Sequence, residues 1–375
     1  MNQKNIPFNL CSIQGNEIIY LNKAINNGYF AGDGEFSKKC NKLFETKLSI
    51  KKSLLTPSCT HALEMAAILL NISPGDEVII PSFTFVSTVN AFVLRGAKPV
   101  FIDIRRDTLN INEALLEPLI TKKTKAIIVV HYAGVGCEME KIIDIAKRYD
   151  VPIVEDNAHG LFGKYNNQYL GSFGTFATQS FHETKNFTCG EGGALFINDE
   201  KYVERAEIIR EKGTNRSEFF RGEVDKYTWV DIGSSFLMSD LSAGFLYGQL
   251  EKKHKIQEKR KKIWDQYYFK LEQWAKNRGF SMPFVPKNCM QSYHMFYLIM
   301  PSLSSRTKFI AHLKKNGINA VFHYLPLHLS PMGKKFNEQN NNCPVTEKIA
   351  NRIIRLPFYT DLDISKINFE AIYQF

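Results

Sequence analysis

The chain has 375 residues, of which 44% are hydrophobic and 13% aromatic, a composition typical of a folded globular protein. This length exceeds one ordinary hydrophobic core, so we expect one large and one smaller domain or two domains. No run of about 18 uncharged apolar residues and no N-terminal signal pattern is visible, so we expect neither a membrane span nor secretion. Seven scattered cysteines without a C-x-x-C pair argue against a disulfide framework and a metal site, and favour a cytoplasmic location.

The formal net charge of +10 raises the question of a nucleic-acid partner. Much of the excess lies in residues 251–274, where Ile256, Ile263 and Tyr267 keep an apolar stripe at helical spacing. The lysines therefore mainly cover the outer face of a predicted helix. Because the basic aromatic motifs of RNA-binding modules are absent, we expect no nucleic acid. The charge still favours the approach of a small phosphorylated substrate.

Residues 50–200 alternate between short β-branched runs and longer helical patterns. This alternation predicts an α/β fold with a mostly parallel sheet that helices cover on both faces. The last two strands follow one another without a helix, which predicts a mixed part of the sheet. The predicted helices are 59–72, 86–96, 111–122 and 138–150, and the predicted strands are 51–55, 76–80, 98–104, 125–130, 151–156, 176–181 and 192–197.

The C-terminal part has a different pattern. A strand-like run at 294–300, a helical pattern at 304–317 and a further apolar run at 318–328 predict a smaller α+β domain. We therefore expect a large domain over 1–250, including an N-terminal arm, and a small domain over 251–375. The polar stretch 337–343 predicts a surface loop.

The carboxyl ends of the predicted strands are where ligands bind in such sheets. "LLTPSCTHALEMAA" (54–67) places small hydroxyl residues before a helix, where unpaired N–H groups form an anion site or are simply capped. No Walker-type or G-x-G-x-x-G motif opens a helix, so ATP and NAD are disfavoured. After the next strand come Phe83 and Phe85, which either pack into the core or stack on a ligand.

Two further strand ends carry ionisable side chains. In "VPIVEDNAHG" (151–160) an apolar strand ends in Glu155–Asp156, where the carboxylate is either a helix cap or the partner of a cationic ring nitrogen. In "SFHETKNFTCGEGG" (180–193), Lys185 lies in a turn between two apolar runs, and the following glycines let the backbone approach a ligand closely. Alone, Lys185 reads as surface charge.

Together these features form a set that one cofactor requires. Pyridoxal 5′-phosphate (PLP) needs a lysine, an acid for its ring nitrogen, a helix N-terminus for its phosphate and a flat side chain against its ring. All four occur here, each at a strand end. The set predicts a PLP enzyme.

The same segments, with "PGDEVIIPSFTFVSTVNAFVLRGAKPVFIDI" and "EIIREKGTNRSEFFRGEVDKYTWVDIGSSFLMSDL", closely resemble the DegT/StrS nucleotide-sugar aminotransferases. The resemblance runs from about residue 6 to the C-terminus. It implies an aspartate-aminotransferase-like fold (type I) and a homodimer with active sites at the subunit interface. It also implies that Lys185 is the Schiff-base lysine and Asp156 the partner of the ring nitrogen.

By the same resemblance, His159 lies near the ring hydroxyl and Phe85 stacks on the ring. Cys59, Thr60 and Ser180 match phosphate contacts. Where much of the family has G-x-N-x-R, this chain reads "GSSF", so Ser235 takes the asparagine's place toward the partner subunit and no arginine follows. His328 matches a position near the substrate diphosphate.

The activity that the resemblance implies is transfer of the amino group of L-glutamate to the 4-keto carbon of dTDP-4-dehydro-6-deoxyglucose. The product is dTDP-4-amino-4,6-dideoxygalactose, a sugar of surface polysaccharides. Some family members are dehydratases with histidine in place of the lysine, and the presence of Lys185 favours transamination. Amination at C3, another nucleotide keto-sugar and a non-catalytic PLP-binding regulator stay open.

Overall fold

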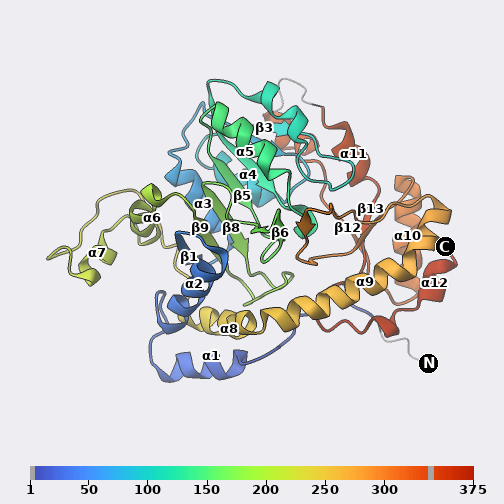
Figure 1. The fold of residues 1–375 in the computed structure, drawn as a ribbon, viewed down its shortest axis with the longest axis horizontal. Helices are drawn as coiled ribbons and strands as arrows, with labels where there is room; N and C mark the ends of the chain where they lie inside the picture. The colour runs from blue at the N-terminus through green and yellow to red at the C-terminus, as the bar shows by residue number, and fades with distance from the viewer. Residues whose placement is uncertain (1–4, 337–341) are drawn as a thin grey trace.

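The computed structural model describes residues 5–336 and 342–375 and is built around a seven-stranded sheet (Figure 1). The strand order is β1-β9-β8-β5-β4-β2-β3, and β9 runs antiparallel to both of its neighbours while the remaining pairs are parallel. This confirms the predicted mixed sheet. The strands are β1 (Lys52–Thr56), β2 (Glu77–Pro81), β3 (Lys98–Ile102), β4 (Thr124–Val130), β5 (Ile153–Asp156), β8 (Phe176–Ser180) and β9 (Gly193–Ile197).

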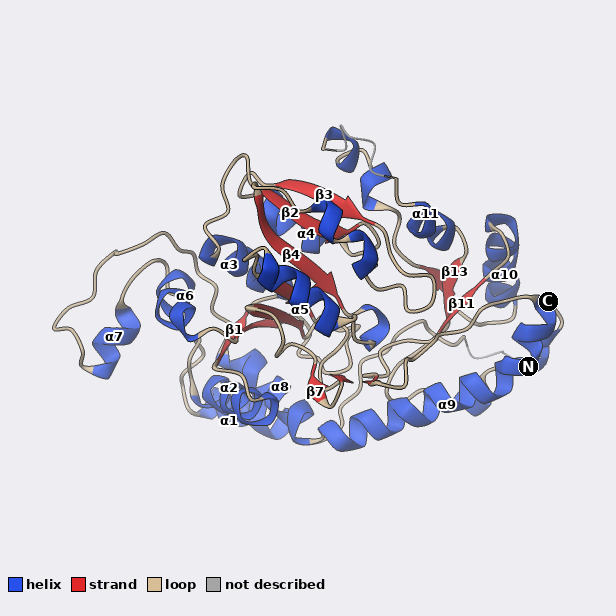
Figure 2. Cartoon of the chain, turned by 45° about the horizontal axis from the view of Figure 1, so that its top comes forward, coloured by secondary structure: helices blue, strands red, loops and turns tan. Residues whose placement is uncertain are grey.

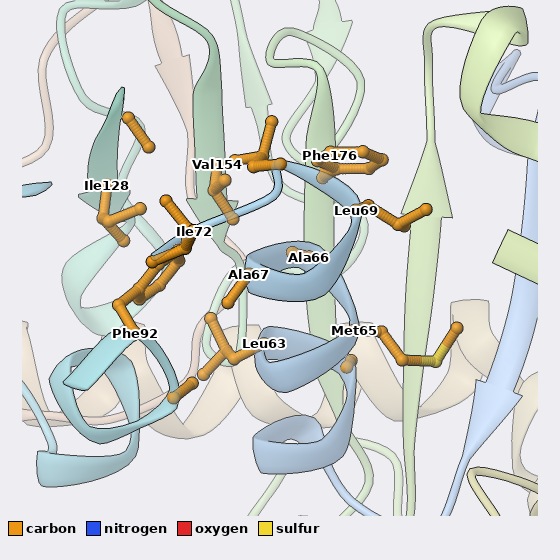
Figure 3. Packing of buried hydrophobic residues seen from close by; sticks show 14 of the residues in the cluster. Leu63, Met65, Ala66, Ala67, Leu69, Ile72, Phe92, Ile128, Val154 and Phe176 are labelled. Carbon is orange, nitrogen blue, oxygen red and sulfur yellow. The ribbon is translucent and has the colours of Figure 1, made fainter. Parts of the chain in front are cut away.

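Helices cover both faces of this sheet because consecutive strand residues point to opposite sides. Ile80, Ile128 and Val154 face α3 (Cys59–Leu69), α4 (Val86–Val93) and α6 (Val203–Arg210) in one core, part of which Figure 3 shows. Ile127 and Ile153 face α5 (Met139–Arg148) on the other side. On that same side, α2 (Glu35–Leu48) and α8 (Asp240–Glu251) cover the β1-β9-β8 end of the sheet.

One predicted helix is wrong. Residues 111–122 form two short 3-10 turns, Glu113–Leu115 and Glu117–Leu119, in place of a helix. Pro118 lacks a backbone N–H and disfavours the α conformation in the residue before it, so the apolar spacing of this stretch cannot extend into an α-helix. The other three predicted helices are confirmed as α3, α4 and α5, with somewhat shorter bounds.

The C-terminal part forms a second core around a small antiparallel sheet, β11-β13-β12. Its strands are β11 (Tyr297–Ile299), β12 (Val321–Phe322) and β13 (Ile353–Arg355), and its helices are α9 (Lys253–Arg278), α10 (Leu303–Lys315), α11 (Pro344–Ala350) and α12 (Phe369–Tyr373). Ile6 also packs into this core, so the N-terminal arm touches the C-terminal part. The boundary at residue 250 stays a prediction. Residues 337–341 of the predicted loop lie outside the described part.

The remaining elements lie at the periphery of the large sheet. A third small sheet, β10-β6-β7, joins β10 (Cys289–Met290) to β6 (Lys164–Tyr165) and β7 (Gln168–Tyr169). α1 (Glu17–Asn26) lies along α8, and α7 (Arg216–Arg221) stands away from the body of the molecule (Figures 1 and 2). Over the described ranges, the chain contains no helix with the length and apolar character that a membrane span needs.

Candidate active site

A cavity of about 790 Å³ opens where the carboxyl ends of the large sheet meet the small C-terminal sheet. Asp156 and Ser180 are the last residues of β5 and β8, and Arg355 is the last residue of β13. Residues from both ends of the chain, including Phe8, also line it. The cavity therefore lies where parallel strands end, the position that the sequence predicts.

Lys185 lies in the turn that joins β8 to β9. Its backbone N–H donates to the carbonyl of His182 at 2.9 Å, which closes the turn, and its side chain lines the cavity. Within the described residues, the Lys185 amine makes no hydrogen bond or ion pair. Burial lowers the pKa of this amine below its ordinary value, an effect that Cys59 and Asp156 oppose. Lys185 is thus a half-buried cavity amine rather than solvated surface charge.

Asp156 is 5% exposed and lines the same cavity. Its Oδ2 accepts a hydrogen bond from the Thr88 hydroxyl at 2.7 Å, and its Oδ1 accepts one from the backbone N–H of Ala158 at 3.2 Å. Thr88 in turn lies 2.9 Å from the hydroxyl of Thr84. These bonds hold the carboxylate in one orientation.

The N-terminus of α3 faces the cavity through Ser58, Cys59 and Thr60. Ser58 is the N-cap, and its side chain accepts the backbone N–H of His61 at 3.2 Å. The Thr60 hydroxyl donates to that of Ser87 in α4 at 2.9 Å, which joins two helix N-termini. Unpaired N–H groups and the helix dipole make this corner suitable for a phosphate.

The two candidate aromatics separate in the structure. Phe83 is 1% exposed and packs in the core, whereas Phe85, immediately before α4, is 57% exposed and lines the cavity. An exposed flat side chain at a cavity wall is available to stack on a ring. Phe85 is therefore the aromatic that the structure brings to the site.

His159 provides a test of whether the site fits PLP. The residue is 6% exposed, lines the cavity, and its Nδ1 is buried without a hydrogen-bond partner. A buried polar atom without a partner is costly, and a bound polar group such as the ring hydroxyl of PLP satisfies it. Burial, together with Lys185, lowers the pKa of His159, which favours a neutral imidazole. His159, Lys185, Asp156 and the N-terminus of α3 together fit PLP.

Sequence reasoning missed the cavity residues that come from the C-terminal part. Those with polar side chains are His294, His323, Tyr324 and Arg355. The Nε of Arg355 is buried without a partner, and the guanidinium carbon lies 4.8 Å from the centre of the Phe8 ring. The one signal in the sequence is Arg355, a charged residue inside the otherwise apolar stretch "IIRLPF".

Two predicted residues lie away from the cavity of the same chain. Ser235 is exposed and pairs with Glu211, and it does not line the cavity. His328 is 1% exposed, with Nδ1 2.6 Å from the Ser82 hydroxyl and Nε2 3.1 Å from a Glu347 carboxylate oxygen. The structure does not bring His328 to this cavity, and its contact with a substrate stays a prediction.

A lysine, a buried carboxylate, a helix N-terminus and an exposed aromatic around one cavity of this fold define a PLP-dependent aminotransferase of fold type I. The chain belongs to the DegT/DnrJ/EryC1/StrS aminotransferase family, whose profile matches residues 12–368.

Known proteins of similar sequence and structure agree with this assignment. The spore coat polysaccharide biosynthesis protein SpsC of Bacillus subtilis is 30% identical over 365 residues, which cover 95% of this chain and 93% of SpsC. The uncharacterized protein MJ1066 of Methanocaldococcus jannaschii is 36% identical over 341 residues, 88% of each chain. The putative sugar aminotransferase Spr1654 of Streptococcus pneumoniae superimposes with a TM-score of 0.90 at 27% identity, covering 98% of this chain and 96% of Spr1654. Structures of Spr1654 include PLP and PMP forms.

Proposed function

We propose that the protein transfers the amino group of L-glutamate to the 4-keto carbon of dTDP-4-dehydro-6-deoxyglucose. The products are 2-oxoglutarate and dTDP-4-amino-4,6-dideoxygalactose, so one amino group and one keto oxygen change places. The observation that carries the proposal is the convergence of Lys185, Asp156 and Arg355 on one cavity. A lysine and a carboxylate are what PLP requires, and the half-buried guanidinium of Arg355 suits a carboxylate of the amino donor.

Each residue has a defined task in this reaction. When bound, PLP supplies an electron sink for the carbon that loses its proton. Lys185 holds the cofactor covalently and, once released, takes the proton from the donor Cα and returns one to the sugar C4. Burial favours this role because it lowers the pKa of the amine, which makes the neutral base easier to form.

The remaining contacts hold the cofactor in place. Asp156, which Thr88 and the N–H of Ala158 orient, pairs with the ring nitrogen. The buried Nδ1 of His159 would satisfy the ring hydroxyl, and Phe85 would stack on the ring. Cys59, Thr60 and Ser180 bind the phosphate at the N-terminus of α3 and the end of β8.

Arg355 is suited to a carboxylate of the amino donor. Its guanidinium presents several donors in a fixed plane, which matches a carboxylate. The Nε has no partner in the described residues, although it is buried. An isolated buried donor of this kind is stabilised when a carboxylate enters the cavity. This supports an amino acid as the donor, and the choice of glutamate rests on the sequence resemblance.

A sugar acceptor is supported by the relatives and by the size of the cavity. SpsC is a spore coat polysaccharide biosynthesis protein, and Spr1654 is described as a putative sugar aminotransferase. A cavity of about 790 Å³ is large enough for a cofactor and part of a nucleotide sugar. Transfer to C4 and the galacto product rest on the sequence resemblance.

A homodimer is part of this proposal. The segment around α7 exposes a group of large apolar side chains, which a second copy of the chain can cover. These are Phe219, Phe220, Tyr227, Trp229, Val230 and Ile232. Ser235 follows this segment and is exposed, which leaves it available to the phosphate site of the partner. Light scattering after size-exclusion chromatography tests the dimer, and a lower PLP affinity of S235A tests the contact.

Product NMR decides the reaction. The PLP-loaded protein is incubated with L-glutamate and a series of nucleotide keto-sugars, and the amino sugar is identified by its proton couplings. We expect an axial amino group at C4 from the dTDP-4-keto sugar. An equatorial C4 amino group or a C3 amino group contradicts the product assignment. A protein that binds PLP but leaves glutamate unchanged is instead a regulator, and the proposal fails.

A further inference from the structure

His294 lies between the two loops that carry His159 and Lys185. It is 6% exposed, and its ring stacks on the ring of His159 with centroids 4.2 Å apart and planes 15° apart. Its Nδ1 lies 2.9 Å from the side-chain oxygen of Asn186, the residue that follows Lys185. One side chain thus contacts both the histidine at the cofactor site and the neighbour of the lysine.

The hydrogen bonds of Asn186 determine which atom donates and which accepts between Asn186 and His294. Asn186 is 7% exposed, and its Nδ2 donates to the backbone carbonyl of Ser292 at 2.7 Å. Its Oδ1 must then accept, so the Nδ1 of His294 carries a hydrogen. Burial lowers the pKa of His294, which favours the neutral ring with that single N–H. The amide of Asn186 is therefore held at both its oxygen and its nitrogen.

The segment that carries His294 is fixed to the rest of the site. Ser292 is fully buried, its N–H donates to the carbonyl of Gly134 at 3.1 Å, and its hydroxyl donates to the backbone carbonyl of His159. Residues 292–294 therefore contact His159 through both backbone and ring, and reach the Lys185 turn through Asn186. This segment leads into β11 of the C-terminal sheet.

We propose that His294 is a positioning residue that fixes the lysine turn and the His159 ring relative to one another. Its hydrogen bond to Asn186 holds the backbone beside Lys185, and its ring holds the plane of His159, which lines the cavity. The proposal rests on the proposed function only in assigning PLP chemistry to Lys185 and His159. Neither hydrogen bonding nor stacking by His294 depends on a bound substrate.

Two variants separate the two contacts. His294→Phe keeps a flat ring against His159 and removes the N–H donor to Asn186. His294→Asn keeps a donor near the same place and removes the ring. Asn186→Leu removes the same hydrogen bond from the other side, and serves if a His294 variant does not fold. His312→Phe is the matched control, since it removes a ring hydrogen bond of 2.7 Å to the carbonyl of Ala371, away from the cavity.

The first measurement is hydrogen exchange of the apoprotein by mass spectrometry, over peptides that cover residues 182–188. Loss of a hydrogen bond opens the turn more often, so we expect exchange about fivefold faster in H294F, which loses one bond. N186L loses this bond and the bond to Ser292, so its exchange should be at least as fast. H294N and H312F should exchange like wild type in these peptides. Unchanged exchange in both H294F and N186L overturns the role of His294 at the turn.

The second measurement is the pH titration of the visible absorption band of the PLP-loaded protein. Because His159 lines the cavity that would hold the cofactor, we expect H294N to shift the midpoint of this titration, while H294F stays close to wild type. A residue that only fills space changes the melting temperature without moving the midpoint, so an unmoved midpoint in H294N overturns the role at His159. Glutamate turnover by the wild type is tested separately and decides the proposed function independently.

Discussion

Glu155 and Asp156 are consecutive residues of β5 whose carboxylates face opposite sides of the sheet. Asp156 lines the cavity, whereas Glu155 is fully buried and accepts hydrogen bonds from the backbone N–H groups of Gly171, Phe173 and Gly174 at 2.7–2.8 Å. The period of two along a strand produces this separation. The two adjacent acids therefore have different roles, one toward the ligand and one toward the fold.

Glu155→Gln should destabilise the protein. His131 also donates to Glu155, through Nε2 at 2.8 Å, because its Nδ1 accepts the N–H of Cys137. All four partners are donors, so an amide NH₂ at this position faces donors and leaves them unpaired. We expect the free energy of unfolding to fall by about 3–5 kcal/mol.

Urea unfolding of the apoprotein measures this change, and Asp156→Asn is the matched control. Asparagine at 156 keeps an oxygen acceptor, so the free energy of unfolding of this variant should fall by only about 1 kcal/mol. Equal free energies of unfolding for the two variants would contradict the conclusion that Glu155 stabilises the fold.

Thr88→Val should lower turnover without unfolding the protein. The substitution keeps the shape of the side chain and removes the 2.7 Å hydrogen bond to Asp156. A bond to a charged group contributes about 1.5–3 kcal/mol, which corresponds to roughly a tenfold to hundredfold lower kcat. Steady-state kinetics test this. A kcat equal to that of wild type would show that Asp156 needs no support from Thr88.

Arg355→Gln should weaken binding of the amino donor without changing binding of the cofactor. If the guanidinium binds a glutamate carboxylate, its loss raises the KM for glutamate by roughly tenfold to a hundredfold. PLP affinity should change little. Arg278→Gln, in which the lost contact is to the carbonyl of Phe375 far from the cavity, is the control. A KM for glutamate that stays unchanged in R355Q would remove Arg355 from the donor site.

The lowered pKa of Lys185 predicts an unusual pH dependence of cofactor attachment. Only the neutral amine reacts with the aldehyde of PLP, so the rate of reconstitution of apoprotein rises with pH through the pKa of Lys185. Because that pKa is depressed in the folded protein, the rate should level off below the value of about 10.4 typical of exposed lysine. N-acetyl-lysine methylamide is the comparison. A rate that still rises through this value would contradict the burial argument.

The strands of the large sheet could be predicted from the sequence because they are continuous apolar runs that need little context. The two 3-10 turns within 111–122 could not be predicted, since the apolar spacing there is that of an amphipathic helix and only Pro118 prevents one from forming. Lys185 and Asp156 could be identified as candidates from the sequence because Asp156 ends one predicted strand and Lys185 lies in the turn after another.

The cavity residues of the C-terminal part could not be predicted from the sequence. Arg355, His323 and His294 come from a distant part of the chain and reach the cavity only through the packing of the C-terminal sheet. No local pattern distinguishes such residues from ordinary polar positions. The position of Ser235 outside the cavity of its own chain likewise becomes meaningful only with a second copy.

The most direct test of the central claim is a single-turnover reaction of the PLP-loaded protein with L-glutamate, without any sugar. We predict that the visible band of bound PLP is replaced by the near-ultraviolet band of its amine form, with one 2-oxoglutarate released per active site. Lys185→Ala, loaded with PLP, should lack this conversion. A wild-type protein whose visible band persists with glutamate, or a K185A protein that converts at the wild-type rate, would contradict the account.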